Sequence, residues 1–156
     1  KILFKLRNRF GGKSITIKET IQRIIELKEN SRKAIIAFVS DQAPLWSGKY
    51  HWSNFFQWET PVVTGAEQIG KHVDALIFYA EMERIKRGYY RCKISRMIDD
   101  IQQYADYEVT DLFMSKLEQS IHKAPSYWLW THNRWIRTRE EIMVWYKRII
   151  HKKENV

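Results

Sequence analysis

The chain has 156 residues, of which 44% are hydrophobic, and its formal net charge at pH 7 is +9. The length fits one domain, and the hydrophobic content is high enough to bury a core, which excludes a disordered chain. A single cysteine, Cys92, excludes an internal disulfide framework. The excess of basic residues indicates an acidic partner, and nucleic acid, anionic lipid and an acidic protein all fit that description.

The first third of the chain predicts a helix followed by a strand. Thr16 and Glu19 form a capping box before a run of apolar residues at helical spacing, so a helix is expected over residues 16–29. Residues 34–40 are a short β-branched run and are expected to form a buried strand. Helix followed by strand is typical of an α/β sheet. Residues 45–60 show no clear period and predict a loop with a short strand.

The middle of the chain predicts a helix and a hairpin. A helix is expected over residues 65–74, since small residues stand at its start. Residues 75–83 and 89–96 read as paired strands. Gly88 suits the turn between them because glycine accepts a positive φ.

The last third predicts two further helices. A polar loop is expected over residues 98–107, and an amphipathic helix over 109–122 that Pro125 ends. Thr138 and Glu141 form a second capping box, which predicts a final helix. One side of that helix is apolar, with Ile142, Trp145, Tyr146, Ile149 and Ile150. Its basic residues lie elsewhere on the helix: Lys147, Arg148, Lys152 and Lys153.

Several chemistries are not expected from the motifs. The sequence contains no CxxC, HExxH, P-loop or GxGxxG pattern, so neither a metal nor another cofactor is predicted. The longest plain apolar run, residues 34–39, is far shorter than the roughly 20 residues that a membrane-spanning helix needs. We therefore expect that this chain does not cross a bilayer.

Three blocks in order carry the strongest signal. They are Phe-Val-Ser-Asp-Gln-Ala-Pro at 38–44, Pro-Val-Val-Thr-Gly-Ala at 61–66, and Ala-Pro-Ser-Tyr-Trp-Leu-Trp-Thr-His-Asn-Arg-Trp at 124–135. Together they resemble the C-terminal half of the lipid A biosynthesis acyltransferases. The resemblance extends from about Arg7 to Arg137. It implies an α/β fold that is part of an open mixed sheet flanked by helices, like the glycerolipid acyltransferases.

The resembled family transfers a fatty acyl chain from acyl carrier protein to a hydroxyl of a lipid A precursor. Its catalytic motif is a histidine followed five positions later by Asp or Glu. None of the five histidines here has an acidic residue at that spacing. We therefore expect a C-terminal fragment of an O-acyltransferase that is inactive alone, with its catalytic base in a missing N-terminal half.

The resemblance also implies a domain plan, partners and a location. Residues 1–138 are expected to be the C-terminal part of the acyltransferase domain, and residues 139–156 a basic amphipathic helix. The implied partners are an acyl carrier protein thioester, a phosphorylated glycolipid acceptor, the membrane surface and the missing N-terminal half, with no nucleic acid. The implied location is the cytoplasmic face of the bacterial inner membrane.

Ten residues are candidates for substrate binding. Asp and Gln after a strand end could hold a sugar hydroxyl, small residues at a helix start allow close approach, and arginines can grip phosphate. Two departures from the family pattern are Asn133 in place of an arginine and Phe78 where a proline is common. The candidates are Arg7, Asn8, Arg9, Asp41, Gln42, Thr64, Gly65, Arg84, Arg87 and Arg134.

Two other functions stay open at this point. Charge and aromatic content also suit a nucleic-acid-binding module, although no recognisable reader motif is present. A non-catalytic domain at the membrane surface, related to the acyltransferases but without their chemistry, is the second alternative. A His-x-x-x-x-Asp/Glu motif upstream in the same reading frame would favour the enzyme.

Overall fold

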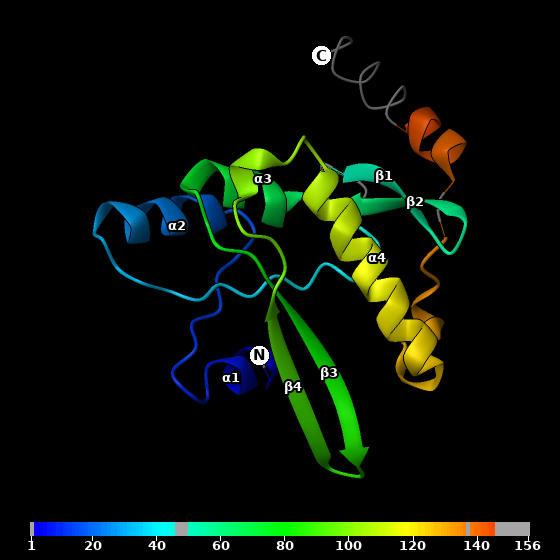
Figure 1. The fold of residues 1–156 in the computed structure, drawn as a ribbon, viewed down its shortest axis with the longest axis horizontal. Coiled ribbons are helices and arrows are strands. Elements are labelled where there is room, and N and C mark those ends of the chain that lie inside the picture. The colour runs from blue at the N-terminus through cyan, green and yellow to red at the C-terminus, as the bar shows by residue number, and fades with distance from the viewer. Residues whose placement is uncertain (1, 46–49, 137, 146–156) are drawn as a thin grey trace. The chain divides into compact units, whose positions relative to one another are not determined.

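The computed structural model describes residues 2–45, 50–136 and 138–145, shown in Figure 1. They fall into two compact units, one within Lys1–Ala37 and the other within Phe38–Val156. Helices and two antiparallel hairpins make up the regular structure, so the fold is mixed α/β. Among these described residues, no helix combines the length and the apolar composition that crossing a bilayer requires.

The first unit contains two helices, α1 (Ile2–Arg7) and α2 (Thr20–Glu29). The helix predicted over 16–29 is confirmed, but its regular part begins at Thr20. The capping-box pair lies in the preceding turn, where the Thr16 hydroxyl donates to Glu19 Oε2 at 2.8 Å. The sequence analysis missed α1, which is only six residues long.

The buried strand expected over residues 34–40 is wrong. The segment is not part of either sheet, and the Ile35 side chain is fully exposed. A strand is stable only when a neighbour satisfies its backbone hydrogen bonds, and no described strand pairs with this one. The described residues therefore hold two separate two-stranded sheets in place of one open mixed sheet.

A hairpin replaces most of the loop expected over 45–60. Strands β1 (Tyr50–Phe55) and β2 (Trp58–Val63) pair antiparallel, from Tyr50 opposite Val63 to Phe55 opposite Trp58. The two turn residues, Phe56 and Gln57, have φ angles of 52° and 63°. A two-residue turn of this kind needs positive φ twice, and such turns usually carry Asn-Gly or Asp-Gly. The pair Phe-Gln offers no such signal.

The predicted helix and hairpin in the middle of the chain are confirmed. Helix α3 runs over Gly65–Val73, and strands β3 (Phe78–Lys86) and β4 (Tyr89–Arg96) pair antiparallel. Gly88 closes their turn with a φ of 80°. Local turn chemistry was sufficient to predict this hairpin.

The helix predicted over 109–122 is also confirmed as α4 (Glu108–Lys123). The expected loop before it contains one turn of 3₁₀ helix, η1 (Ile101–Gln103), in which Ile101 is buried. Two more such turns follow α4, η2 (Pro125–Tyr127) and η3 (Trp130–His132).

Residues 139–145 are helical, as the second capping box predicts. The Thr138 amide donates to Glu141 Oε2 at 3.0 Å, and the Glu141 amide donates to Thr138 Oγ1 at 3.3 Å. The basic positions expected in this helix lie outside the described residues: Lys147, Arg148, Lys152 and Lys153. The domain boundary at residue 138 stays a prediction.

Helix α4 supplies the core of the second unit. Its apolar side packs on the β1–β2 hairpin, which lies beside it in Figure 1. That cluster of buried side chains is Phe55, Val62, Met114, Leu117 and Ile121. A second cluster of Ile98, Ile101 and Val109 lies at the start of α4. The two clusters fix the helix against β1–β2 and against the segment after β4.

Candidate functional site

A cavity of about 400 Å³ lies between residues 38–41, strand β3 and helix α4. Residues after α4, including Tyr127 and Trp128, complete its wall. Ligand pockets in proteins usually measure about 300–1,000 Å³, so this cavity can hold a small ligand or part of a larger one. We name it the Asp41 cavity, because Asp41 lines it.

The Asp41 cavity has an apolar side and a polar side. Its apolar lining consists of Phe38, Val39, Ala80, Met82, Phe113, Leu117, Ile121, Ala124 and Trp128. Its polar lining consists of Ser40, Asp41, Tyr79, Glu81, Ser120 and the phenol of Tyr127. A lining of this kind suits a ligand that is itself amphiphilic, since apolar surface gains from burial and polar groups need partners.

Hydrogen bonds join the polar residues of β3 to those of α4. The Tyr79 hydroxyl lies 3.0 Å from Ser120 Oγ, which lies 3.2 Å from Glu81 Oε1. Lys123 Nζ donates to the same carboxylate oxygen at 3.2 Å. Tyr79 and Glu81 share one face of the strand, because side chains two apart point the same way. Ser120 and Lys123 lie one helical turn apart and face them.

The cavity keeps Tyr79 neutral and Glu81 charged. Burial raises the pKa of Tyr79 above its ordinary value of 10.0, and the charges of Glu81 and Asp41 act in the same direction. The phenol is therefore a hydrogen-bond donor at neutral pH. The hydrogen bond from Lys123 is the main cause that lowers the pKa of Glu81 below 4.5.

This lowered pKa predicts an acid-sensitive contact. The contribution of Glu81 to stability is complete above its unfolded value of 4.5 and is lost as pH falls through the lower folded value. In urea unfolding between roughly pH 3 and pH 6, Lys123→Gln should therefore lose less stability on acidification than the wild type. Lys116→Gln, on the same helix, is the control. Parallel pH profiles for the wild type and Lys123→Gln would contradict the assignment.

Of the predicted site residues, Asp41 lines this cavity, and its neighbour Gln42 contacts it. Gln42 Nε2 donates to Asp41 Oδ2 at 2.8 Å, which holds the carboxylate in place. Gln42 Oε1 is buried and has no hydrogen-bond partner among the described residues. Gln42 is not among the residues that line the cavity, so contact between Gln42 and substrate stays a prediction.

The two arginines predicted on the β3–β4 hairpin lie in different places. The Arg84 guanidinium lies 5.5 Å from the centre of the Tyr127 ring, so it borders the Asp41 cavity. Arg87 is exposed in the turn of the hairpin. The structure therefore places Asp41 in the cavity lining, with Gln42 and Arg84 each in contact with a lining residue, and leaves Arg87 at the hairpin tip.

Thr64 and Gly65 lie at the start of α3, as expected, and no part of the described chain approaches Gly65 closely. A Cβ on Gly65 would meet no atom within 4 Å. The close approach occurs at Gly70, where a Cβ would lie 2.9 Å from Ile101 Cδ1. Thr64 is buried beside the β1–β2 hairpin. A substrate role for Thr64 and Gly65 stays a prediction.

The basic group at the start of the chain belongs to the first unit. Arg7 lies in α1, a helix that was not predicted from the sequence. Asn8 Oδ1 accepts hydrogen bonds from the amide and the hydroxyl of Ser14, both at 2.9 Å. The Arg9 guanidinium lies 5.4 Å from the Phe10 ring centre. Phosphate binding by Arg7, Asn8 and Arg9 stays a prediction.

Arg134 is almost completely buried, with 3% of its surface exposed. Its Nη2 donates to the carbonyl oxygen of Pro61 at 2.7 Å. The neighbouring Trp135 indole donates to Thr60 Oγ1 at 2.9 Å. The block around Arg134 thus packs on β2. Contact between Arg134 and substrate stays a prediction, and its burial favours a structural role.

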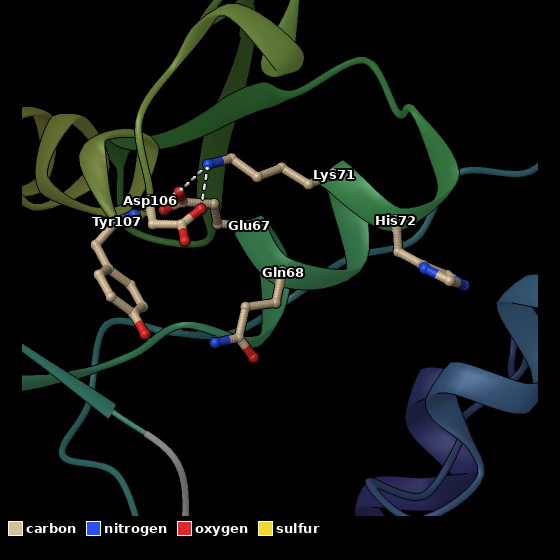
Figure 2. Close-up of a pocket in the computed structure, with 6 residues that line it drawn as sticks. All are labelled: Glu67, Gln68, Lys71, His72, Asp106 and Tyr107. Atoms are coloured by element: carbon tan, nitrogen blue, oxygen red, sulfur yellow. Dashed lines mark hydrogen bonds and ion pairs between the residues drawn. The ribbon is translucent and has the colours of Figure 1, made fainter.

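A second hollow, of about 390 Å³, lies between α3 and the start of α4, and Figure 2 shows its lining residues. Lys71 Nζ lies 2.9 Å from Asp106 and 3.3 Å from Glu67, so its ammonium bridges two carboxylates. The hydrogen bond to Asp106 is the main cause that raises the pKa of Lys71 above 10.5. Because these charges neutralise one another, the hollow offers little to a charged ligand.

Glu67 was not recognised in the sequence, yet it fastens α3 to α4. Its carboxylate, 4% exposed as a residue, accepts from the amides of Tyr107 and Thr110 at 2.7 and 2.8 Å and from the Thr110 hydroxyl. Tyr107 occupies the N-cap position of α4 and provides no capping side chain. The sequence does carry one signal for this contact. Tyr107 cannot cap α4, and the amides of an uncapped helix start need acceptors from elsewhere in the fold.

A histidine–carboxylate pair also forms between distant positions. His51 Nε2 lies 3.3 Å from Asp111, and the His51 ring stacks on Tyr107 with ring centres 4.7 Å apart. The two residues are 60 positions apart, so a search for fixed motif spacing could not find them. Neither His51 nor Asp111 lines the Asp41 cavity. Within the described part of the chain, no cluster of metal-ligand side chains is present.

Two comparisons with known proteins bear on this site. A family model described as bacterial lipid A biosynthesis acyltransferase matches residues 1–137. That range includes the whole Asp41 cavity and all ten predicted site residues. Comparison with curated proteins finds no match.

Proposed function

The chain belongs to the bacterial lipid A biosynthesis acyltransferase family, and we propose that it forms the substrate-holding C-terminal region of a membrane-associated O-acyltransferase. Family membership implies an acyl carrier protein thioester as the donor and a lipid A precursor as the acceptor. In our proposal the acyl chain passes to a hydroxyl of that phosphorylated glycolipid, at the cytoplasmic face of the bacterial inner membrane.

The reaction needs a base, a positioned hydroxyl and a stabilised oxyanion. A histidine held by a carboxylate takes the proton of the hydroxyl, whose oxygen attacks the thioester carbonyl. The tetrahedral oxyanion collapses, the carbon–sulfur bond breaks, and the thiolate takes up a proton. No histidine here has an acidic residue five positions later. We propose that residues outside these 156 supply the base.

The Asp41 cavity is the observation that supports a substrate-holding role. It lies beside the first of the three family-like blocks, and it combines an apolar wall with hydrogen-bonding groups. The apolar wall would receive part of the fatty acyl chain. The neutral Tyr79 phenol can donate to a carbonyl oxygen, while the Asp41 side chain can accept from a hydroxyl.

Residues 34–40 are the reason for proposing an open mixed sheet in the active enzyme. Its β-branched composition favours a strand, yet in the described residues it has no pairing partner. We propose that it pairs with a strand supplied from outside these 156 residues. The sheet would then be of the glycerolipid-acyltransferase type.

Filling the cavity tests its assignment. Ala124→Trp places an indole at the end of α4, where Ala124 lines the cavity, and it should weaken binding of a dodecanoyl-pantetheine thioester by about tenfold. Two displaced methylene groups are enough for an effect of that size. Calorimetric titration of the purified chain measures it, and we expect no turnover of the thioester.

Ile94→Trp is the matched control. Ile94 is exposed on the face of the β3–β4 hairpin that does not carry Tyr79 and Glu81, and it does not line the cavity. Its variant should bind the thioester like the wild type. Equal affinities for the wild type and both variants, or no binding by any of them, would refute the cavity assignment. Turnover of the thioester by this chain alone would refute the proposal that residues outside it supply the catalytic base.

A further inference from the structure

The β3–β4 hairpin has one face that packs and one that does not. Residues directly opposite in the register share a face, so Tyr79 and Glu81 point with their partners toward α4. The other face pairs Ala80 with Ile94 and Met82 with Cys92. Its large apolar side chains are all more than half exposed: Phe78, Met82, Tyr90 and Ile94.

The tip of this hairpin, residues 84–91, is strongly basic. It contains four basic residues and no acidic one: Arg84, Lys86, Arg87 and Arg91. Arg91 also lies 3.4 Å from Glu83, the residue just before the tip, so the other three cations carry most of its charge. Three apolar or aromatic side chains stand among them, and each is about half exposed or more: Ile85, Tyr89 and Tyr90. Cations and apolar groups are thus concentrated at one exposed end of the strand pair, at the turn seen in Figure 1.

A β-bulge shapes the tip. The register shifts between Arg84 and Lys86, so Ile85 is an extra residue on β3. Lys86 Nζ lies 4.4 Å from the centre of the Tyr89 ring. Such a contact holds the ammonium beside an apolar surface, and the long lysine stem can extend to keep its charge in water.

We propose that the tip formed by residues 84–91 docks on the surface of an anionic lipid bilayer. Its four cations would lie among the lipid phosphates, where each Lys or Arg adds to binding. Tyr89 and Tyr90 are of the residue type that prefers the membrane–water interface, and Ile85 can enter the headgroup boundary. This inference stands apart from the cavity assignment, since it requires no acyl substrate.

Charge and composition favour a bilayer over other occupants. A second copy docking tip to tip would bring four cations against four, and like charges facing each other repel. Nucleic acid would neutralise the cations through its phosphates but would leave Ile85 and the apolar face exposed to water. A bilayer accommodates both kinds of group at once.

The test uses vesicles of phosphatidylglycerol and phosphatidylcholine, without any lipid A precursor, in a sedimentation assay at low salt. The tip variant is Lys86→Gln, Arg87→Gln and Arg91→Gln together, which should weaken vesicle binding by roughly 100-fold. The matched control removes three exposed lysines of the first unit: Lys18→Gln, Lys28→Gln and Lys33→Gln. It should weaken binding by less than about threefold, because those lysines are not part of the tip.

A second variant tests the apolar part of the tip. Ile85→Ser with Tyr90→Ser keeps every charge and should weaken vesicle binding by roughly tenfold. All these positions are exposed, and circular dichroism verifies that each variant is folded. Equal losses in the tip and control triples would overturn the proposal, as would vesicle binding that the serine variant leaves unchanged. A tip variant impaired on duplex DNA but not on vesicles would identify nucleic acid as the partner.

Discussion

Replacing Glu67 with alanine is expected to lower the free energy of unfolding by about 3 kcal/mol. The carboxylate is buried and accepts from the Tyr107 amide, the Thr110 amide and the Thr110 hydroxyl. Removing it leaves those donors without their acceptor, and it leaves Lys71 with only Asp106. Urea unfolding followed by circular dichroism measures the loss.

Gln68→Ala is the control for Glu67, because it changes an exposed neighbour on the same helix. We expect that control to shift the free energy of unfolding by less than about 0.5 kcal/mol. Glu67→Gln retains one carbonyl acceptor and should fall between the two. If Glu67→Ala were as stable as Gln68→Ala, then Glu67 would not be the tertiary cap that fastens α4.

Replacing Phe55 with alanine is expected to cost about 4 kcal/mol of stability. The ring is completely buried and stacks on Trp135, with ring centres 5.8 Å apart. Its deletion opens a cavity in the cluster that holds the β1–β2 hairpin against α4. Thermal and urea unfolding should both report the loss.

Trp58 offers a matched control for Phe55. It lies directly across from Phe55 in the hairpin, but it is exposed. Trp58→Ala should change stability by no more than about 0.5 kcal/mol, although it deletes the larger side chain. Equal costs for Trp58→Ala and Phe55→Ala would mean that α4 and the hairpin do not share this core.

Local signals predicted the elements whose stability is local. Helix α4 and the turn at Gly88 follow from apolar spacing and from a glycine that accepts positive φ. The β1–β2 hairpin was missed because its turn, Phe56–Gln57, contains none of the residues that usually favour positive φ. Residues 34–40 were predicted as a strand from composition, but a strand also needs a partner, which composition does not reveal.

The candidate site was predictable only in part, because it combines residues that are far apart in the sequence. Asp41 and Gln42 were identified by the block that carries them; in the structure Asp41 lines the cavity and Gln42 donates to it. The contact between Tyr79 and Ser120 joins residues 41 positions apart, and only the fold brings them together. The alternation of Tyr79 and Glu81 on a strand was visible in the sequence, but the helix that faces them was not.

The central claim is that the Asp41 cavity receives the fatty acyl chain, and photocrosslinking tests it most directly. A dodecanoyl-pantetheine thioester with a diazirine near the end of its chain is bound to the purified chain and illuminated. Mass spectrometry then locates the labelled residues. We predict labels on the apolar wall, at Phe113, Leu117 or Trp128, which are lost in Ala124→Trp. Labels confined to the hollow around Glu67 and Lys71, or to the first unit, would contradict the account.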